Sequence, residues 1–280
     1  MEHDGATAHG RLHRTTHTGQ HASATDRAGT DALTGAGTDA DPGVPARLRD
    51  LPGWLFRGQR AVILLLLMTL TADVAFMGLH VWAHYNDDNH MYLVHTDRGH
   101  AEFFQYIKFL FLFVLTAYYA VEQRCWQVAM WLFLFVFFLV TDMLRWHEMQ
   151  GGRIADALGL ESAFGLRGQD FGELVYLAVA GLVLGVPLVA GFFWGTRRTK
   201  WIYWAFLVPT ALLFFAGVVL DQLHMMAITY VPRIRNYMAI AEDGGEMLAT
   251  SLLIAVALRL TVSGGAPGLP LRRPDGSRAP

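Results

Sequence analysis

Acidic and histidine side chains recur at helical spacing within the apolar part of this 280-residue chain. Asp221 and His224 stand three residues apart, and Glu242 and Glu246 stand four apart. In a helix, residues at these spacings share one face, so each pair could direct two polar side chains at the same point. Carboxylate and imidazole groups bind Fe, Zn and Mn, and they also exchange protons. The pairs therefore indicate either a metal site or a proton path.

A metal centre is the first hypothesis. Helical bundles build di-metal sites from Glu residues and Glu-x-x-His pairs on neighbouring helices, and Asp221 with His224 has the same spacing. The match is partial, because the apolar segments contain one such pair and it begins with Asp. The predicted ligands of a divalent or di-metal centre (Fe, Zn or Mn) are Asp142, His147, Asp221, His224, Glu242 and Glu246. Glu148 and Glu173 are the candidate catalytic bases, acting on bound water whose pKa a metal lowers to about 7.

A haem is a weaker alternative, although four histidines could serve as its axial ligands. They are His80, His84, His147 and His224. Many carboxylates are unexpected around a haem iron and natural around a harder metal.

A proton or cation path is the main alternative to a metal centre. Lys108 and Arg145 place positive charge among the acids, which compensates buried carboxylates but opposes a nearby metal ion. The simplest expected partners of Lys108 are Asp73 and Asp142. The alternative function is a proton- or cation-coupled transporter, and a structural or assembly subunit is the third.

Charges near helix ends could instead lie among lipid head groups. This explanation fits Glu102, Asp170 and Asp243, which lie near the ends of the expected helices. It is weaker for four residues a turn or more inside, which we expect to face the bundle interior: Asp73, Lys108, Asp142 and Asp221.

The amino-acid composition limits the class of protein that could hold these acidic and histidine side chains. Hydrophobic residues make up 53% of the chain and charged residues only 16%, where soluble domains carry roughly 25%. The mean hydropathy is +0.30. A soluble enzyme is therefore unlikely on composition, and scattered basic residues with a net charge of -2 argue against nucleic-acid binding. The single cysteine, Cys125, excludes CxxC-type zinc and iron–sulfur sites.

Long apolar runs predict an all-α, polytopic transmembrane helical bundle of about six spans, with the lipid bilayer as its main partner. The expected spans are 61–84, 102–122, 125–149, 170–195, 201–229 and 240–262. We predict a disordered, His-containing tail over 1–50, the transmembrane domain over 51–262 and a second disordered tail over 263–280. The ionisable residues gather toward one end of this bundle, where a small-molecule or lipid substrate could bind.

Three segments support this architecture by resemblance. They are Asp142-Met-Leu-Arg-Trp-His-Glu, Gln169-Asp-Phe-Gly-Glu and Glu242-Asp-Gly-Gly-Glu-Met. They resemble motifs of uncharacterised multi-pass bacterial membrane proteins, and the likeness covers most of residues 61–262. The resemblance implies a multi-helix membrane protein and no particular activity, substrate or cofactor.

Lys and Arg predict the orientation, because cytoplasmic loops carry an excess of both. With the N-terminus inside, twelve lie on the cytoplasmic side: Arg47, Arg49, Arg57, Arg60, Arg124, Arg197, Arg198, Lys200, Arg259, Arg272, Arg273 and Arg278. Five lie opposite: Arg98, Arg153, Arg167, Arg233 and Arg235. We therefore expect an inner-membrane protein with both termini in the cytoplasm and a polar cluster that opens outward.

A cysteine-accessibility map can test this predicted orientation. Cysteines introduced at residues 196–200 should react only with reagents that reach the cytoplasm, because this basic turn is expected inside. Labelling of the same positions from the outside would contradict the predicted topology.

Overall fold

The computed structural model describes residues 50–56, 58–86 and 89–262, and these residues are almost entirely helical. They form no β-strand, which confirms the predicted all-α fold. The predictions for the two tails lie outside the described residues. In chain order the elements are α1 (Leu51–Phe56), α2 (Arg60–Asn86), η2 (His90–Tyr92), α3 (His100–Glu122), α4 (Trp126–Met143), α5 (Trp146–Leu158), α6 (Gly168–Trp194), α7 (Arg197–Phe214), η3 (Phe215–Leu220), α8 (Asp221–Tyr230), η4 (Pro232–Ile234) and α9 (Arg235–Val262).

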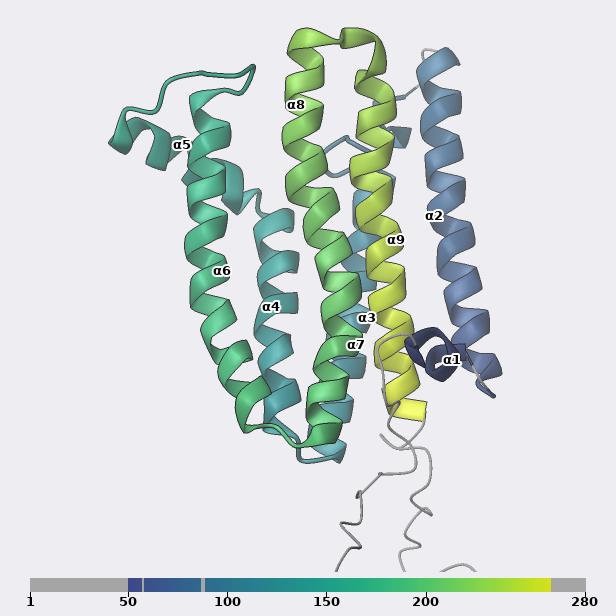
Figure 1. Cartoon of the computed structure of the whole chain (residues 1–280). Coiled ribbons are helices and arrows are strands. Elements are labelled where there is room, and N and C mark those ends of the chain that lie inside the picture. The colour runs from purple at the N-terminus through teal and green to yellow at the C-terminus, as the bar shows by residue number, and fades with distance from the viewer. Residues whose placement is uncertain (1–49, 57, 87–88, 263–280) are drawn as a thin grey trace, which may run out of the picture. The chain divides into compact units, whose positions relative to one another are not determined.

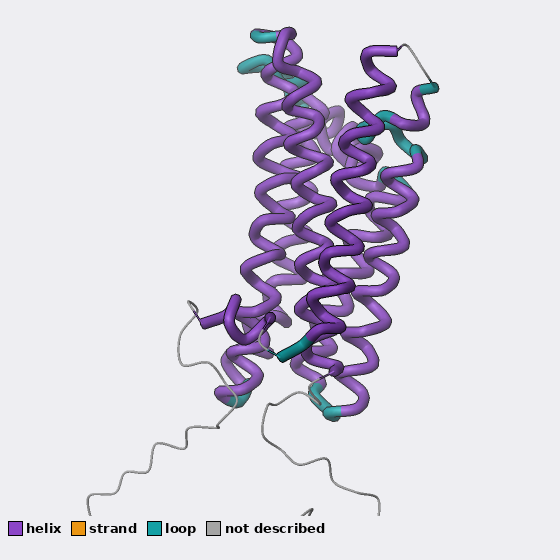
Figure 2. The backbone as a smooth tube through the Cα atoms, turned by 90° about the vertical axis from the view of Figure 1, so that its right-hand side faces the viewer, coloured by secondary structure: helices purple, strands orange, loops and turns teal. Residues whose placement is uncertain are grey.

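Six helical segments are long and apolar enough to cross a membrane. Five contain a single long helix each, namely α2, α3, α4, α6 and α9, and the other joins α7, η3 and α8 into one span, Arg197–Tyr230. The long helices lie side by side in Figure 1, and Figure 2 shows the same arrangement from a perpendicular view. The protein is therefore a membrane protein of six candidate spans, as the sequence predicts.

The third span is shorter than predicted. We expected one helix over 125–149, but α4 ends at Met143 and α5 begins at Trp146. Arg145 separates them with a left-handed backbone conformation, φ 51°. A helix cannot continue through such a residue, so the chain changes direction there. Asp142 therefore lies on α4 and Glu148 on α5, with Arg145 between them, although the predicted span placed all three on one helix.

The last span begins earlier than predicted. We expected it to start at residue 240, but α9 starts at Arg235. Asp243 consequently lies two turns inside the helix instead of near its end. Assigning Asp243 to the head-group region on the basis of a nearby helix end is therefore incorrect.

Helix α9 lies at the centre of the bundle and contacts α2, α3, α7, η3 and α8. Its buried side includes several small residues: Ala249, Thr250, Ser251, Ala255 and Ala257. Small side chains allow neighbouring helices to approach closely, which favours helix association where lipid supplies no hydrophobic drive. The side chains of α9 can therefore meet those of most other spans.

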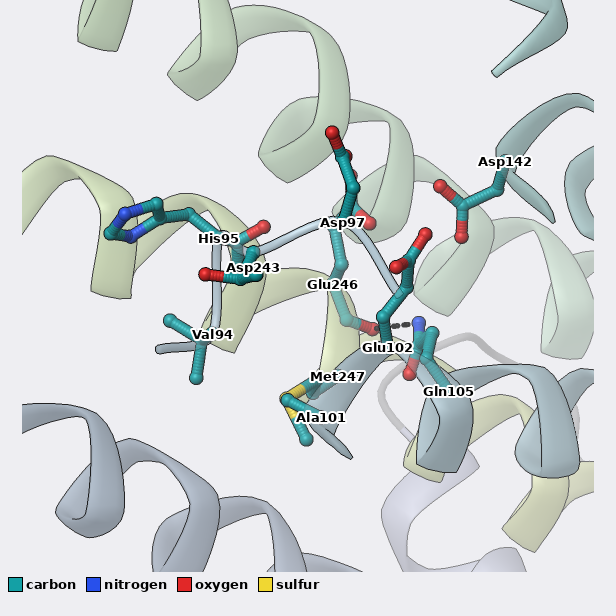
Figure 3. A pocket seen from close by; sticks show the side chains of 11 residues that line it. Val94, His95, Asp97, Ala101, Glu102, Gln105, Asp142, Asp243, Glu246 and Met247 are labelled. Carbon is teal, nitrogen blue, oxygen red and sulfur yellow. Dashed lines mark hydrogen bonds between the residues drawn. The ribbon is translucent and has the colours of Figure 1, made fainter. Parts of the chain in front are cut away.

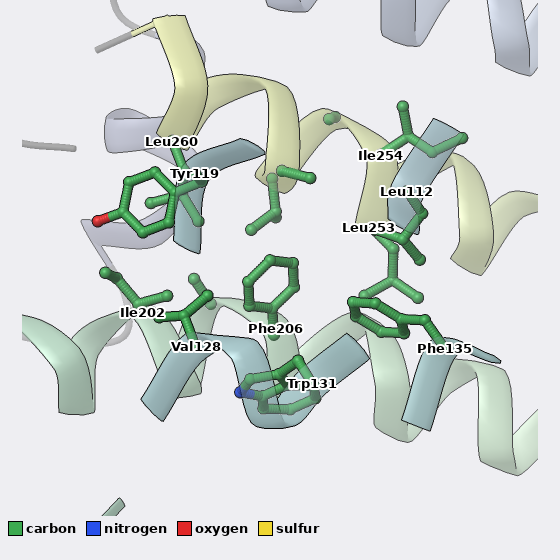
Figure 4. Packing of buried hydrophobic residues seen from close by; sticks show 14 of the residues in the cluster. Leu112, Tyr119, Val128, Trp131, Phe135, Ile202, Phe206, Leu253, Ile254 and Leu260 are labelled. Atoms are coloured by element: carbon green, nitrogen blue, oxygen red, sulfur yellow. The ribbon is translucent and has the colours of Figure 1, made fainter. Parts of the chain in front are cut away.

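Large apolar side chains fill the end of the bundle that carries α1, where α4 and α7 begin. Trp131, Phe135 and Phe206 pack together there, and the ring centroids of Trp131 and Phe206 are 5.3 Å apart (Figure 4). Leu253 and Ile254 of α9 are fully buried in the same cluster. We call this the α1 end; the opposite end, where α6 and α9 begin, is the acidic end.

Helices α5 and α6 cross at a pair of glycines. A Cβ atom added to Gly172 would overlap the carbonyl oxygen of Gly151 and would lie 3.1 Å from the amide nitrogen of Ala155. At Gly151, an added Cβ would collide with the side chain of Glu173. The crossing therefore fixes where α5 lies and where the Glu173 side chain is held.

A pair of glycine substitutions in α6 tests this crossing. Gly172→Ala should lower stability by about 1–3 kcal/mol, because the added methyl group overpacks the contact with Gly151. Gly185→Ala should be neutral or stabilising by about 0.5–1 kcal/mol, because its Cβ would meet nothing within 4 Å and alanine favours helix. Thermal unfolding in detergent measures both, and equal stability of the two variants would contradict the close packing of α5 on α6.

Candidate functional site

A cavity of about 750 Å³ opens at the acidic end between α4, α5, α6, the α7–η3–α8 span and α9. All predicted metal ligands line it, as do both predicted catalytic bases: Asp142, His147, Asp221, His224, Glu242, Glu246, Glu148 and Glu173. Arg145 also lines it, whereas Asp73 and Lys108 do not. The structure thus brings residues of five separate helices to one site.

The break between α4 and α5 places two of these residues. Because the chain turns at Arg145, His147 and Glu148 face the same cavity as Asp142. The His147 ring lies with Nδ1 3.3 Å from the carbonyl oxygen of Thr141. On one continuous helix His147 would point elsewhere, so the left-handed residue makes the convergence possible.

The first turns of α6 contribute two further carboxylates. Asp170 accepts hydrogen bonds from the Arg167 backbone, at 2.7 Å, and from its guanidinium, also at 2.7 Å. Glu173 accepts a hydrogen bond of 2.8 Å from Gln169 Nε2. Both carboxyl side chains are buried. Asp170 therefore acts as a helix cap, while Glu173 is held by a neutral donor and faces the cavity.

A π-helical segment precedes the residues that α8 contributes. This segment, η3, leads directly into Asp221, whose carboxylate accepts a hydrogen bond of 2.9 Å from Gln222. His224 Nδ1 lies 2.6 Å from Glu242 Oε2 of α9. The Glu246 carboxylate lies directly against Gly217 of η3, and any side chain at that position would collide with it. π-helical turns occur often at functional sites, where they redirect side chains.

A smaller chamber of about 90 Å³ adjoins the loop between η2 and α3 (Figure 3). Its charged and histidine lining is His95, Asp97, Glu102, Asp142, Asp243 and Glu246. The loop is anchored because the Val94 amide donates a hydrogen bond of 3.1 Å to His80 Nδ1. Sequence reasoning left His95 and Asp97 out of the site and assigned Glu102 to head groups. Their position depends on this loop contact, which has no local sequence signal.

His95 is neutral in this setting. Burial lowers its pKa below the usual 6.5, and the nearby His224 imidazole and the Arg235 guanidinium lower it further, against the opposing effect of Glu242. The side chain therefore contributes no positive charge to the chamber at neutral pH.

Acidic side chains greatly outnumber basic ones around the larger cavity. Ten Asp and Glu residues line it, against two arginines, and its described lining includes no lysine. Both arginines are engaged near the rim: Arg145 pairs with Asp97 at 2.9 Å and with Glu148, and Arg167 pairs with Asp170 at 2.7 Å. In the described part of the chain no Lys or Arg reaches ion-pair distance of four carboxylates: Asp142, Asp221, Asp243 and Glu246.

Several buried oxygen atoms around the cavity have no hydrogen-bond partner among the described residues. They are Thr141 Oγ1, Thr210 Oγ1, Gln222 Oε1 and Asp243 Oδ2. Thr141 is 9% exposed and lines the cavity. Amide and ionised carboxylate oxygens accept but cannot donate hydrogen bonds. The amide oxygen of Gln222 and the carboxylate oxygen of Asp243 therefore suit a ligand that donates hydrogen bonds or carries positive charge.

The predicted metal centre is not supported by the geometry. Within the ranges that the structure describes, no group of three or more His, Cys, Asp or Glu residues is arranged to hold a metal ion. The predicted ligands share a cavity but do not converge on one point. Metal binding therefore stays a prediction, together with the catalytic roles of Glu148 and Glu173.

Lys108 and Asp73 form an ion pair outside the cavity lining, buried among the helices. Lys108 Nζ donates to Asp73 Oδ1 at 2.8 Å and to the Met247 carbonyl at 2.8 Å. Ser251 Oγ donates to Asp73 Oδ2 at 2.6 Å. The side chains of Lys108 and Asp73 are only 1% and 0% exposed. Of the two partners expected for Lys108, the structure selects Asp73, while Asp142 lines the cavity.

Comparison with known proteins adds no family to this description: the chain matches no known protein-family model, no curated protein and no solved structure.

The buried ion pair can be tested by removing one partner or both. Lys108→Met alone should cost about 3–5 kcal/mol, because it leaves the Asp73 carboxylate buried without its counter-charge. Combining it with Asp73→Asn should recover more than half of that loss in thermal unfolding experiments. Lys200→Met is the matched control and should be near neutral. A double variant no more stable than Lys108→Met would contradict a compensated pair.

Proposed function

We propose that this protein is a membrane carrier that exchanges protons for a cation at the acidic cavity. The observation that carries the proposal is the excess of carboxylates around one cavity, four of which have no Lys or Arg partner in the described chain. Taking an ionised carboxylate out of water is costly unless a proton or a cation compensates it. Protons and a bound cation would therefore compete for the same oxygens.

Polar contacts continue from the cavity into the bundle along α9. Gln105 Nε2 donates to Thr250 Oγ1 at 2.8 Å, and Thr250 donates to the Glu246 carbonyl at 2.9 Å. The next residue after each of these, Met247 and Ser251, binds the ion pair. Ionisable residues buried within spans usually belong to ion pathways or proton relays. This continuity supports coupling between the cavity and the pair.

Irregular helix geometry in the α7–η3–α8 span also supports a carrier. Pro209 lies inside α7, and the π-helical turns of η3 follow within six residues. Transporters commonly bind substrate at interrupted helices, whose ends can shift relative to each other. The packed α1 end would close the cavity on the other side. With the orientation predicted from Lys and Arg, the cavity of an inner-membrane protein would open outward.

A metal-dependent enzyme is the second candidate. His224 lies on the same span as Asp221 and close to Glu242 of α9, and metal-bound histidines typically donate to such a carboxylate. Elemental analysis of detergent-purified protein lacking residues 1–50 separates the two functions. Stoichiometric Fe, Zn or Mn that is lost in an Asp221→Ala/His224→Ala variant would favour the enzyme over the carrier.

Proteoliposomes test the proposed exchange. Gradients of Na⁺, K⁺, Mg²⁺, Mn²⁺ and tetramethylammonium would be imposed in turn while a trapped dye reports internal pH. We expect at least one cation to move protons in the opposite direction, with the rate falling about tenfold or more in Asp142→Asn and Asp221→Asn, since each removes an exchangeable carboxylate. Glu161→Gln, outside the cavity lining, is the matched control and should exchange normally.

Two outcomes would overturn the carrier. One is internal pH that responds to every gradient as it does in protein-free vesicles. The other is exchange that is equally fast in the wild type and in the Asp142→Asn/Asp221→Asn double variant.

A further inference from the structure

The larger cavity has two chemically different halves. Its acidic half lies at the mouth, and its other half is lined by apolar side chains of α4, α6 and α7, among them Leu134, Phe138, Leu177, Leu184 and Leu207. Between Gln169 and Leu184 the lining follows α6 for about 22 Å at 1.5 Å per residue. An inorganic cation would occupy only the acidic half.

We infer that the substrate of this cavity is an amphipathic organic ammonium, with its charged nitrogen among the carboxylates and its apolar part between α4, α6 and α7. The inference rests on the proposed cation exchange and names the class of cation. A volume of about 750 Å³ falls within the range of 300–1,000 Å³ that is typical of sites for drug-sized ligands.

The hydrogen-bonding groups at the boundary between the halves support a primary ammonium. Thr141 and Thr210 place hydroxyl oxygens without partners in the lining, from α4 and α7 respectively, and Gln222 adds an amide oxygen. An ammonium group carries three N–H donors, the same set that a lysine presents. It could therefore pair with a carboxylate such as Asp142 and still donate to other oxygens of the lining.

The apolar half explains why a bare ion is the poorer ligand. Its lining includes Phe137, Phe138 and Phe214. Among the described residues of α6 that line the cavity, none after Glu173 is acidic or basic. Burying an alkyl or aromatic group there contributes roughly 25 cal/mol for each Å² of apolar surface removed from water. A cation with such a group should consequently bind more tightly than the same head group alone.

Gly181 provides a way to fill the apolar half alone. It lines the cavity, and a Cβ atom added there would meet nothing within 4 Å. Gly185, one turn further along α6, is equally open but does not line the cavity. Leucine at these two positions gives a matched pair: Gly181→Leu should occupy space that the ligand needs, and Gly185→Leu should not.

Equilibrium binding to protein in lipid nanodiscs tests the inference, with empty nanodiscs measuring partition into lipid. The probe is 4-phenylbutylammonium, compared with 4-phenylbutanol, 4-phenylbutyrate, its N-trimethyl analogue and methylammonium. We expect the primary ammonium to bind about tenfold or more tightly than each of the others, a difference of about 1.4 kcal/mol. Asp142→Asn should weaken it by a similar factor because one carboxylate is lost.

The variants Gly181→Leu and Gly185→Leu test the apolar half of the cavity specifically. Gly181→Leu should weaken 4-phenylbutylammonium binding about tenfold, and Gly185→Leu, which lies outside the cavity lining, should bind normally. Equal binding of the alcohol and the ammonium, or no effect of Gly181→Leu, would overturn the inference. If small cations still exchange for protons in that case, only the substrate class is wrong; if they do not, the carrier itself is wrong.

Discussion

The free-energy cost of burying ionised side chains away from water determines how the charged residues of this protein are arranged. At the centre of the bundle the cost is met within the chain, because Lys108 of α3 pairs with Asp73 of α2 and both bind groups of α9. Three spans thereby share one polar contact in an otherwise apolar region, which fixes their register. Around the cavity the chain supplies carboxylates without matching cations. That difference is the basis of the proposed exchange at the cavity.

The two ends of the bundle differ in what fills them as well as in charge. At the α1 end, large side chains such as Trp131 and Phe206 fill the space between the helices. At the acidic end, the left-handed Arg145, the π-helical η3 and the glycine crossing of α5 on α6 redirect the chain. Each irregularity brings a polar side chain to the cavity. The departures from regular helix geometry at this end therefore help to form the site.

The sequence predicts the spans well because bilayer thickness and apolar composition determine them locally. It also identifies the residues of the cavity, since buried charges are rare enough within spans to stand out. It fails where geometry depends on distant contacts. The chain turns at Arg145 because this residue has a left-handed backbone conformation. The positions of His95 and Asp97 depend on a loop whose Val94 amide binds His80. The early start of α9, which moves Asp243 inward, lacks a continuous apolar signal because charged and amide side chains and two glycines interrupt residues 235–246.

The central claim is that cations and protons compete for the carboxylates of the acidic cavity. Potentiometric titration of nanodisc-embedded protein in weakly buffered solution measures this competition directly. Addition of Na⁺, K⁺, Mg²⁺ or 4-phenylbutylammonium should in at least one case release protons from the wild type, and the Asp142→Asn/Asp221→Asn variant should release fewer. Cation binding without proton release, or the same release from both proteins, would contradict the account.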